Sequence, residues 1–194
     1  MPLPPPAPRA PAQERRITYR GYHREDGLWD IEGHLRDTKP YDQTMRGRLR
    51  PAGTPVHDME VRVTIDDEMT IVDIHAAMLS TPFEECPRAE PPVRQLIGAT
   101  LGRGWRRALD EAIGSTRGCT HLRELLFGTA TAAFQTLGAY RDHQRQQRGE
   151  PEPERTTPPF FMGGCMSWDF DGPVVARVAP QFIGWHRRQQ ETPR

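Results

Sequence analysis

A chain of 194 residues with 26 basic and 26 acidic side chains has no formal net charge, which argues against a surface specialised for nucleic acid or an anionic membrane. No run of about 18 apolar residues occurs, so the sequence predicts no transmembrane helix. Three cysteines are too few for a disulfide framework, and the first residues lack the apolar centre of a signal peptide. We therefore expect a cytoplasmic protein with reduced thiols. All basic residues except Lys39 are arginine and asparagine is absent, a bias typical of GC-rich bacterial genomes.

The first half of the chain predicts an antiparallel sheet. Residues 1–14 are rich in proline and are expected to be disordered. Apolar and polar residues alternate on both sides of "EDG", which predicts a hairpin with strands near 15–24 and 28–37. A second alternating run over 59–66, a turn at "DDE" and a returning run over 69–76 predict another hairpin. The four strands form a sheet with one polar face and one face that needs cover.

Helical periodicity follows in the second half. Apolar residues recur at helical spacing over 93–109, where the glycines at 102–104 predict a break. The stretch 120–145 carries a long apolar stripe and predicts the best helix of the chain. The fold class is therefore α+β: a four-stranded antiparallel sheet of two hairpins, followed by helices packed on one face, in a single domain over 15–147.

The C-terminal part has a different composition. Residues 148–159 are polar and rich in proline, as linkers are. Residues 160–194 are more apolar but have no sustained period, so their packing is uncertain. This segment either adds a short strand over 174–178 or folds back over the core.

"RGCTHLREL" is the stretch with the strongest indication of chemistry. Thr120 is expected to be the helix N-cap, which places Cys119 just outside the helix and His121 just inside it. A helix N-terminus and a neighbouring imidazole both favour thiolate, the reactive form of cysteine. Cys119 and His121 are therefore the candidate catalytic pair. The alternative is a helix start without chemistry of its own.

The same pair could belong to a metal site. Cys86, Cys119 and His121 would be the core ligands, with Asp73 or Cys165 completing a tetrahedral or cluster site. The spacing matches no zinc-finger template, so the fold would have to bring these ligands together. The sequence leaves open whether zinc, iron or no metal is bound, and scattered structural thiols are the alternative.

Polar residues on the predicted sheet form a third group. Glu32 and His34 share one face of the second strand, and Arg62 lies on the polar face of the third. Such a face can bind an anionic or phenolic ligand or perform acid–base chemistry. It is equally the solvated face that antiparallel sheets normally have.

Three separated motifs resemble a known family: "YHREDGLWDIEGHLRDTK", "GTPVHDMEVRVTID" and "GCTHLREL" with the later "TAAFQT". They are similar to an uncharacterised bacterial family, the domain of unknown function DUF2889, over roughly residues 15–145. The resemblance implies no established reaction. It implies an association with genes for degrading aromatic compounds and for acyl-CoA chemistry.

The layout of sheet, cysteine and Cys/His helix start also resembles the NifU-like iron–sulfur scaffold proteins. That family has His-Cys-Ser where this chain has Cys119-Thr120-His121, and its early Gly-Cys-Gly site is absent here. The likeness implies a shared layout rather than a shared ligand set.

Three functions remain open from the sequence. The first is an enzyme or ligand-binding protein in the catabolism of an aromatic or acyl compound. In it Cys119 and His121 react and the polar sheet residues contact a small-molecule ligand, in a pocket lined by Tyr22, Trp29 or Trp105. The second is the metal or iron–sulfur module. The third is a non-catalytic interaction protein that docks a partner through its proline-rich tail and the glutamine- and arginine-rich end of its long helix. The gene association places the enzyme first; substrate and oligomeric state are not indicated.

Overall fold

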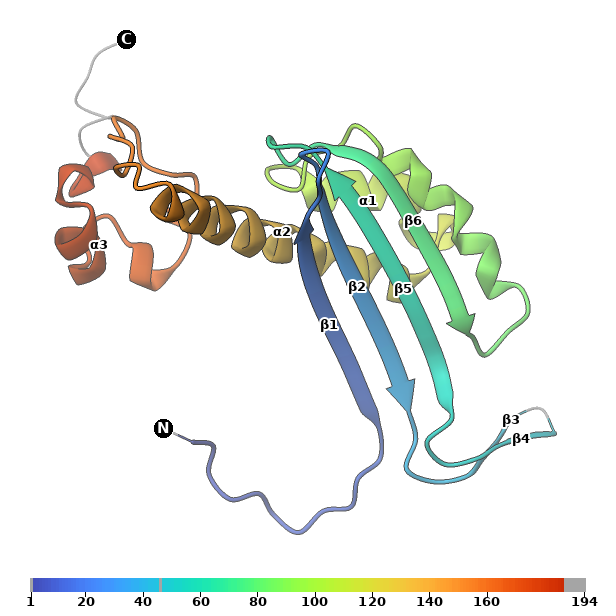
Figure 1. Cartoon of the computed structure of the whole chain (residues 1–194). Helices are drawn as coiled ribbons and strands as arrows, with labels where there is room; N and C mark the ends of the chain where they lie inside the picture. Colours follow the sequence, from blue (N-terminus) through green and yellow to red (C-terminus); the bar gives the residue numbers. More distant parts are fainter. Residues whose placement is uncertain (1, 46, 187–194) are drawn as a thin grey trace. The chain divides into compact units, whose positions relative to one another are not determined.

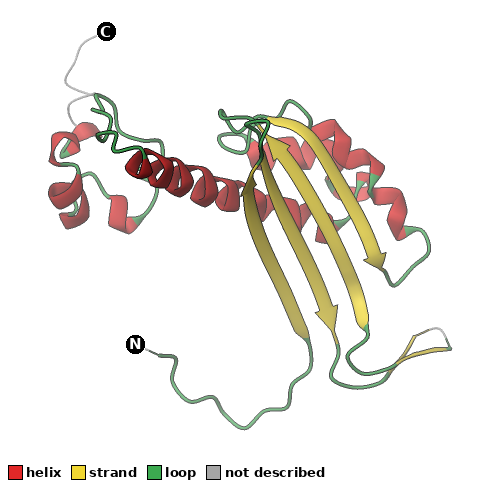
Figure 2. Ribbon diagram, in the orientation of Figure 1, coloured by secondary structure: helices red, strands yellow, loops and turns green. Residues whose placement is uncertain are grey.

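A computed structural model describes residues 2–45 and 47–186 of the chain. Contacts between residues divide the chain into two units, Met1–Gln144 and Arg145–Arg194. The first unit has the predicted α+β architecture, a four-stranded antiparallel sheet followed by helices (Figures 1 and 2). Among the described residues, no helix has both the length and the apolar character needed to cross a bilayer.

The main sheet has the strand order β1-β2-β5-β6, and every neighbouring pair is antiparallel. Its strands are β1 (Glu14–His23), β2 (Trp29–Thr38), β5 (Pro55–Ile65) and β6 (Ile71–Ser80). The predicted strands near 15–24 and 28–37 agree with β1 and β2 within one residue. Alternation is clear in β2, where one face is buried and the other is polar, whereas β1, at the edge of the sheet, has no buried residue.

Tight turns join the strands of each hairpin. Between β1 and β2, Gly27 has a φ of 84°, and the backbone N–H of Arg24 donates to the carbonyl of Leu28 at 2.9 Å. Only glycine adopts this left-handed conformation without strain, so the Asp-Gly pair does determine the turn. The segment between β2 and β5 contains a short hairpin of β3 (Gln43–Met45) and β4 (Arg48–Arg50).

Helices α1 (Trp105–Ile113) and α2 (Thr120–Gln147) lie on one face of the sheet (Figure 2). The predicted helix over 93–109 is broken: Gly104, with a φ of 87°, directly precedes α1. The residues before it form short 3-10 turns, η1 (Cys86–Ala89) and η2 (Pro91–Leu96), and η3 (Ser115–Arg117) follows α1. The core between sheet and helices is apolar and includes Ile31, Val63, Leu109, Leu125 and Leu137.

Close contact between α2 and β1 is possible because small residues face aromatic ones. A Cβ added to Gly128 would lie 2.1 Å from the hydroxyl oxygen of Tyr19, which donates a 2.8 Å hydrogen bond to the carbonyl of Leu125. The helix therefore seats directly on the strand at this point.

The second unit has a small core of its own, formed by Phe170, Val175, Ala179 and Phe182. It contains η4 (Met166–Trp168), α3 (Pro173–Val178) and η5 (Pro180–Phe182). The strand considered over 174–178 is therefore not formed. Pro173 begins a helix instead, which suits proline because the first helical N–H needs no partner. Residues 187–194 of the predicted C-terminal segment lie outside the described residues.

Candidate thiol–imidazole site

Three polar residues form a row across the helix-covered face of the sheet. The strand register pairs Arg15 with Asp37 and Asp37 with His57. The guanidinium of Arg15 donates two hydrogen bonds of 2.8 Å to the two oxygens of Asp37. His57 Nδ1 lies 2.9 Å from Asp37 Oδ2. The carboxylate of Asp37 is only 5% exposed, so this row is an ion-pair network inside the protein.

The charge of Asp37 determines which ring nitrogen of His57 carries a proton. Burial raises the pKa of Asp37, but hydrogen bonds from Arg15 and His57 outweigh burial and hold that pKa below its ordinary value. An ionised carboxylate only accepts hydrogen bonds, so His57 Nδ1 must carry the proton it shares with Asp37. In a neutral His57 the other ring nitrogen, Nε2, is then an unprotonated acceptor.

The start of α2 adds the candidate catalytic pair. The carbonyl of Cys119 accepts a 2.9 Å hydrogen bond from the backbone N–H of Arg123, which makes Cys119 the N-cap residue. The expectation that Thr120 is the N-cap is therefore wrong by one position. Cys119 Sγ lies 3.7 Å from His121 Nδ1, within reach of a hydrogen bond that involves sulfur. The structure thus brings the predicted pair into contact.

His121 joins the pair to the row on the sheet. Its ring stacks on His57 with the ring centroids 3.9 Å apart and the planes inclined by 32°. Burial lowers the pKa of His121, and the charges of His57 and Arg15 lower it further. His121 is therefore neutral near pH 7 and can accept a proton from the neighbouring thiol. This requires the tautomer with hydrogen on Nε2 and a free lone pair on Nδ1.

Cys119 is half-buried and opens into a cavity of about 460 Å³. Cys86 lines the same cavity, so two of the three predicted thiols share one space. Cys165 is exposed and belongs to the second unit. The volume lies within the range of about 300–1,000 Å³ that is typical of small-molecule sites.

Asp73, the carboxylate of the predicted metal set, lies elsewhere. It is on the open face of β6, where it pairs with His75 at 2.9 Å and with Arg94 at 3.4 Å. The strand register aligns Asp73, through β5, with Asp30 of β2. Asp37 is seven residues further along that strand, a separation of roughly 23 Å. The four predicted ligands therefore do not converge.

A different trio has donors close enough for a metal ion. One ligand atom from each of Asp37, His57 and His121 can be chosen so that all three lie within 4.8 Å of one another. Two features of the trio fit metal binding poorly. Stacked rings direct their in-plane lone pairs along similar directions rather than to one point, and the oxygens of Asp37 already accept hydrogen bonds from Arg15 and His57. The arrangement fits proton transfer better than coordination.

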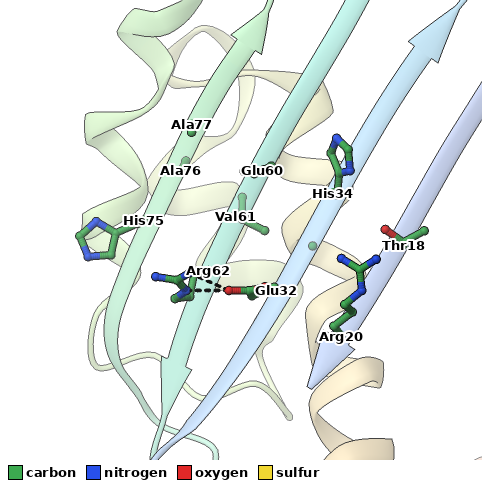
Figure 3. Close-up of a pocket in the computed structure, with 11 residues that line it drawn as sticks. Thr18, Arg20, Glu32, His34, Glu60, Val61, Arg62, His75, Ala76 and Ala77 are labelled. Carbon is green, nitrogen blue, oxygen red and sulfur yellow. Dashed lines mark hydrogen bonds and ion pairs between the residues drawn. The ribbon is translucent and has the colours of Figure 1, made fainter. Parts of the chain in front are cut away.

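The three predicted sheet ligands come together on the opposite, open face. Glu32 and His34 of β2 and Arg62 of β5 line a hollow of about 290 Å³ (Figure 3). Arg62 Nε donates to Glu32 at 2.9 Å, a cross-strand ion pair, and His34 Nε2 lies 2.6 Å from Asp58. Because the sheet separates this hollow from Cys119, one ligand cannot touch both groups. Ligand binding here stays a prediction of its own.

The aromatic residues expected to line a pocket have other roles. Trp29 and Trp105 are buried in the core, and their indole N–H groups donate to Asp67 and to the carbonyl of Leu126. Tyr22 is 45% exposed. The cavity at Cys119 is therefore formed by other residues than those predicted.

Sequence reasoning missed Arg15 and Asp37 as members of the site. The neighbouring residue of His57 in the sequence, Asp58, is no partner for it, since adjacent residues of a strand point to opposite faces. A signal was present: Asp37 lies on the apolar side of its strand, in phase with Ile31 and Leu35. A carboxylate at a buried strand position requires a partner.

Comparison with known families decides the affiliation of this chain. The model of the family described as "Protein of unknown function (DUF2889)" matches residues 13–135. The chain belongs to the DUF2889 family. No curated protein and no solved structure matches it. The likeness to NifU-like scaffolds therefore remains one of layout only. The DUF2889 region contains the five residues of the site, Arg15, Asp37, His57, Cys119 and His121, and the second thiol of the cavity, Cys86.

Proposed function

We propose that the protein is an enzyme that transfers or hydrolyses an acyl group through a nucleophilic Cys119. The observation that supports this proposal most is the contact between the Cys119 thiol and a neutral, half-buried His121, at a cavity large enough for a small molecule. A thiol needs a neighbouring base to become a nucleophile at neutral pH. We place the enzyme in a bacterial cytoplasm, where thiols remain reduced.

The chemistry follows from the positions of the protons. The Cys119 thiol gives its proton to His121 Nδ1 while its sulfur bonds to the carbonyl carbon of the substrate. The leaving group departs with the proton that His121 returns to it, leaving an acyl-enzyme. Water then attacks the thioester, with His121 taking and returning a proton, and releases the acid and the free thiol.

The row on the sheet supports this cycle as positioning machinery. The ring of His121 rests on that of His57, whose Nδ1 proton is held by Asp37. Arg15 keeps Asp37 ionised and in place, and Glu124 holds Arg15 from the other side at 2.6 Å. Acyl or aromatic compounds as substrates agree with the gene association that the family resemblance implies.

Alkylation of the cysteines by iodoacetamide tests the proposal without knowledge of the substrate. The rate at each cysteine is followed by mass spectrometry across neutral pH. We expect Cys119 to react about tenfold faster than the exposed Cys165, because His121 can accept the thiol proton as the sulfur attacks. His121→Gln removes this advantage, whereas the matched variant His75→Gln, on the open face, retains it. Equal rates at Cys119 and Cys165 would contradict the proposal.

A metal site is the second candidate, because three donor atoms lie within 4.8 Å. Elemental analysis of protein purified without a metal-affinity tag distinguishes the two. About one zinc or iron per chain, lost in His57→Gln, would replace acyl transfer by metal-assisted chemistry. An unreactive Cys119 together with no metal would favour the interaction protein.

A further inference from the structure

The charges around the Cys119 cavity carry information on its ligand. Two arginines, Arg88 and Arg117, and one glutamate, Glu85, line it. Among the residues that the structure describes, none of these three side chains forms an ion pair. Arg117 is held instead by a 2.6 Å hydrogen bond from its Nη2 to the carbonyl of Asp110. The cavity therefore has a net charge of one positive unit and two guanidinium groups without a carboxylate partner.

The remaining wall is less polar. Phe83, Cys86 and Ala89 come from the segment after β6 and line the cavity beside Arg88. Arg117 and Cys119 come from the segment that leads into α2. A ligand that spans the cavity thus meets an aromatic ring, a thiol and two cations within one volume of about 460 Å³.

We propose that this cavity selects an acyl or aryl compound with one negative charge, a carboxylate, held by Arg88 and Arg117 while its reactive carbon faces Cys119 and its apolar part contacts Phe83. This inference rests on the proposed role of Cys119 as the nucleophile. A planar guanidinium binds a carboxylate through two parallel hydrogen bonds, which makes arginine suited to this task. Glu85 would repel a second negative charge, so a monoanion fits the net charge better than a phosphate dianion does.

A pair of reagents of nearly equal size tests the charge preference. Iodoacetate carries a carboxylate where iodoacetamide carries a neutral amide, and both alkylate thiols. The rate with iodoacetate divided by the rate with iodoacetamide at Cys119, measured in the full chain, reports the electrostatic potential in the cavity. We expect Arg88→Gln and Arg117→Gln each to lower this ratio about threefold, the effect of removing one charge at a partly hydrated site. Arg103→Gln, the same change at an exposed arginine outside the cavity lining, is the matched control and retains the ratio.

The outcomes separate the two proposals. If Cys119 reacts slowly with both reagents but the ratio of rates depends on Arg88 and Arg117, Cys119 is not the nucleophile, and the proposal of a carboxylate site stands. A fast reaction with iodoacetamide and a ratio unchanged in both arginine variants refutes the carboxylate site alone.

Competition then identifies the anion. We expect benzoate to slow the alkylation of Cys119 by iodoacetamide at concentrations at which benzamide and inorganic phosphate have no effect. Equal protection by benzoate and benzamide would show that the cavity recognises the ring without the charge, and protection by phosphate alone would assign it to phosphate. Either result overturns the proposal.

Discussion

Asp37 is the residue on which the other charges of the site depend. It accepts hydrogen bonds from Arg15 and His57 and is almost fully removed from solvent. Removing one partner of a buried ion pair leaves the other charge without compensation, which costs more than the pair contributes as a whole. The stability of this end of the sheet should therefore depend on the charge of a single carboxylate.

Asp37→Asn tests this dependence. We expect the free energy of unfolding to fall by about 2 kcal/mol at neutral pH, because Arg15 loses its buried ionised partner and keeps only the half-exposed Glu124. The pKa of Asp37 is lower in the folded state than in the unfolded state. The stabilisation it gives is then complete above the ordinary aspartate pKa of about 3.9 and is lost as the pH falls through the folded pKa. Urea denaturation at several pH values measures both effects.

Asp58→Asn is the matched control. Asp58 also pairs with a histidine, His34, but on the open face, where its side chain is 16% exposed. Solvent near this pair screens its charges, so we expect a smaller loss of stability than at Asp37. Equal losses in the two variants would contradict the role assigned to burial in the Arg15–Asp37–His57 row.

The sequence indicated the residues of the site that are close together in the chain and missed the pairing of residues that are far apart in the chain. Cys119 and His121 are two residues apart, and their contact follows from the start of one helix. The pairing of His57 with Asp37 depends on the register between β2 and β5. A one-residue difference in register would turn one of them to the other face, and hydrophobic alternation alone does not determine which residues stand opposite each other.

Helix α2 determines where His121 lies, because its seat on β1 fixes the helix above the sheet. Gly128 is one of two very close approaches between the two elements, with the side chain of Tyr19 against it; the other is Gly21 of β1 against Thr136 of α2. The hydroxyl of Tyr19 is bonded to the carbonyl of Leu125 in the same helix. The ring cannot move away without losing that hydrogen bond, so the contact is rigid as well as close.

Two glycine substitutions in α2 distinguish the effect of its close packing against β1 from the effect of helix propensity. Gly128→Ala places a methyl group against Tyr19 and should lower the free energy of unfolding by about 1–3 kcal/mol. Gly138→Ala, in the same helix, meets no atom within 4 Å and should raise it by about 0.5–1 kcal/mol. Urea denaturation followed by circular dichroism measures both. A gain in both variants would show that α2 does not seat on β1 at Gly128.

The elements differ in how well their sequence pattern predicted them. Strands β2 and β5 alternate clearly because one face is buried under helices, so their positions follow from the sequence. Helix α3 has six residues, fewer than two turns, and its small core gives no periodic signal. Short elements that pack within a small unit are determined by contacts that the local pattern does not contain.

Over the whole molecule, the site and its supporting core belong to one unit. Every residue of the core between sheet and helices lies between Ile17 and Leu137, and the DUF2889 match covers residues 13–135. The second unit, Arg145–Arg194, has its own apolar cluster. The chemistry assigned to Cys119 should therefore not require the second unit.

Limited proteolysis tests this division. Residues 148–157 are exposed and contain neither helix nor strand, so trypsin should cleave after Arg148 and Arg155, together with Arg9 near the N-terminus, before it cleaves within either unit. Exposed segments outside helices and strands are the preferred sites of cleavage. The cleaved protein should alkylate Cys119 at the rate of the intact chain, because Arg15, Asp37, His57 and His121 remain on the same fragment. Early cleavage within the sheet, or loss of the Cys119 reactivity once Arg148 is cut, would show that the second unit completes the site.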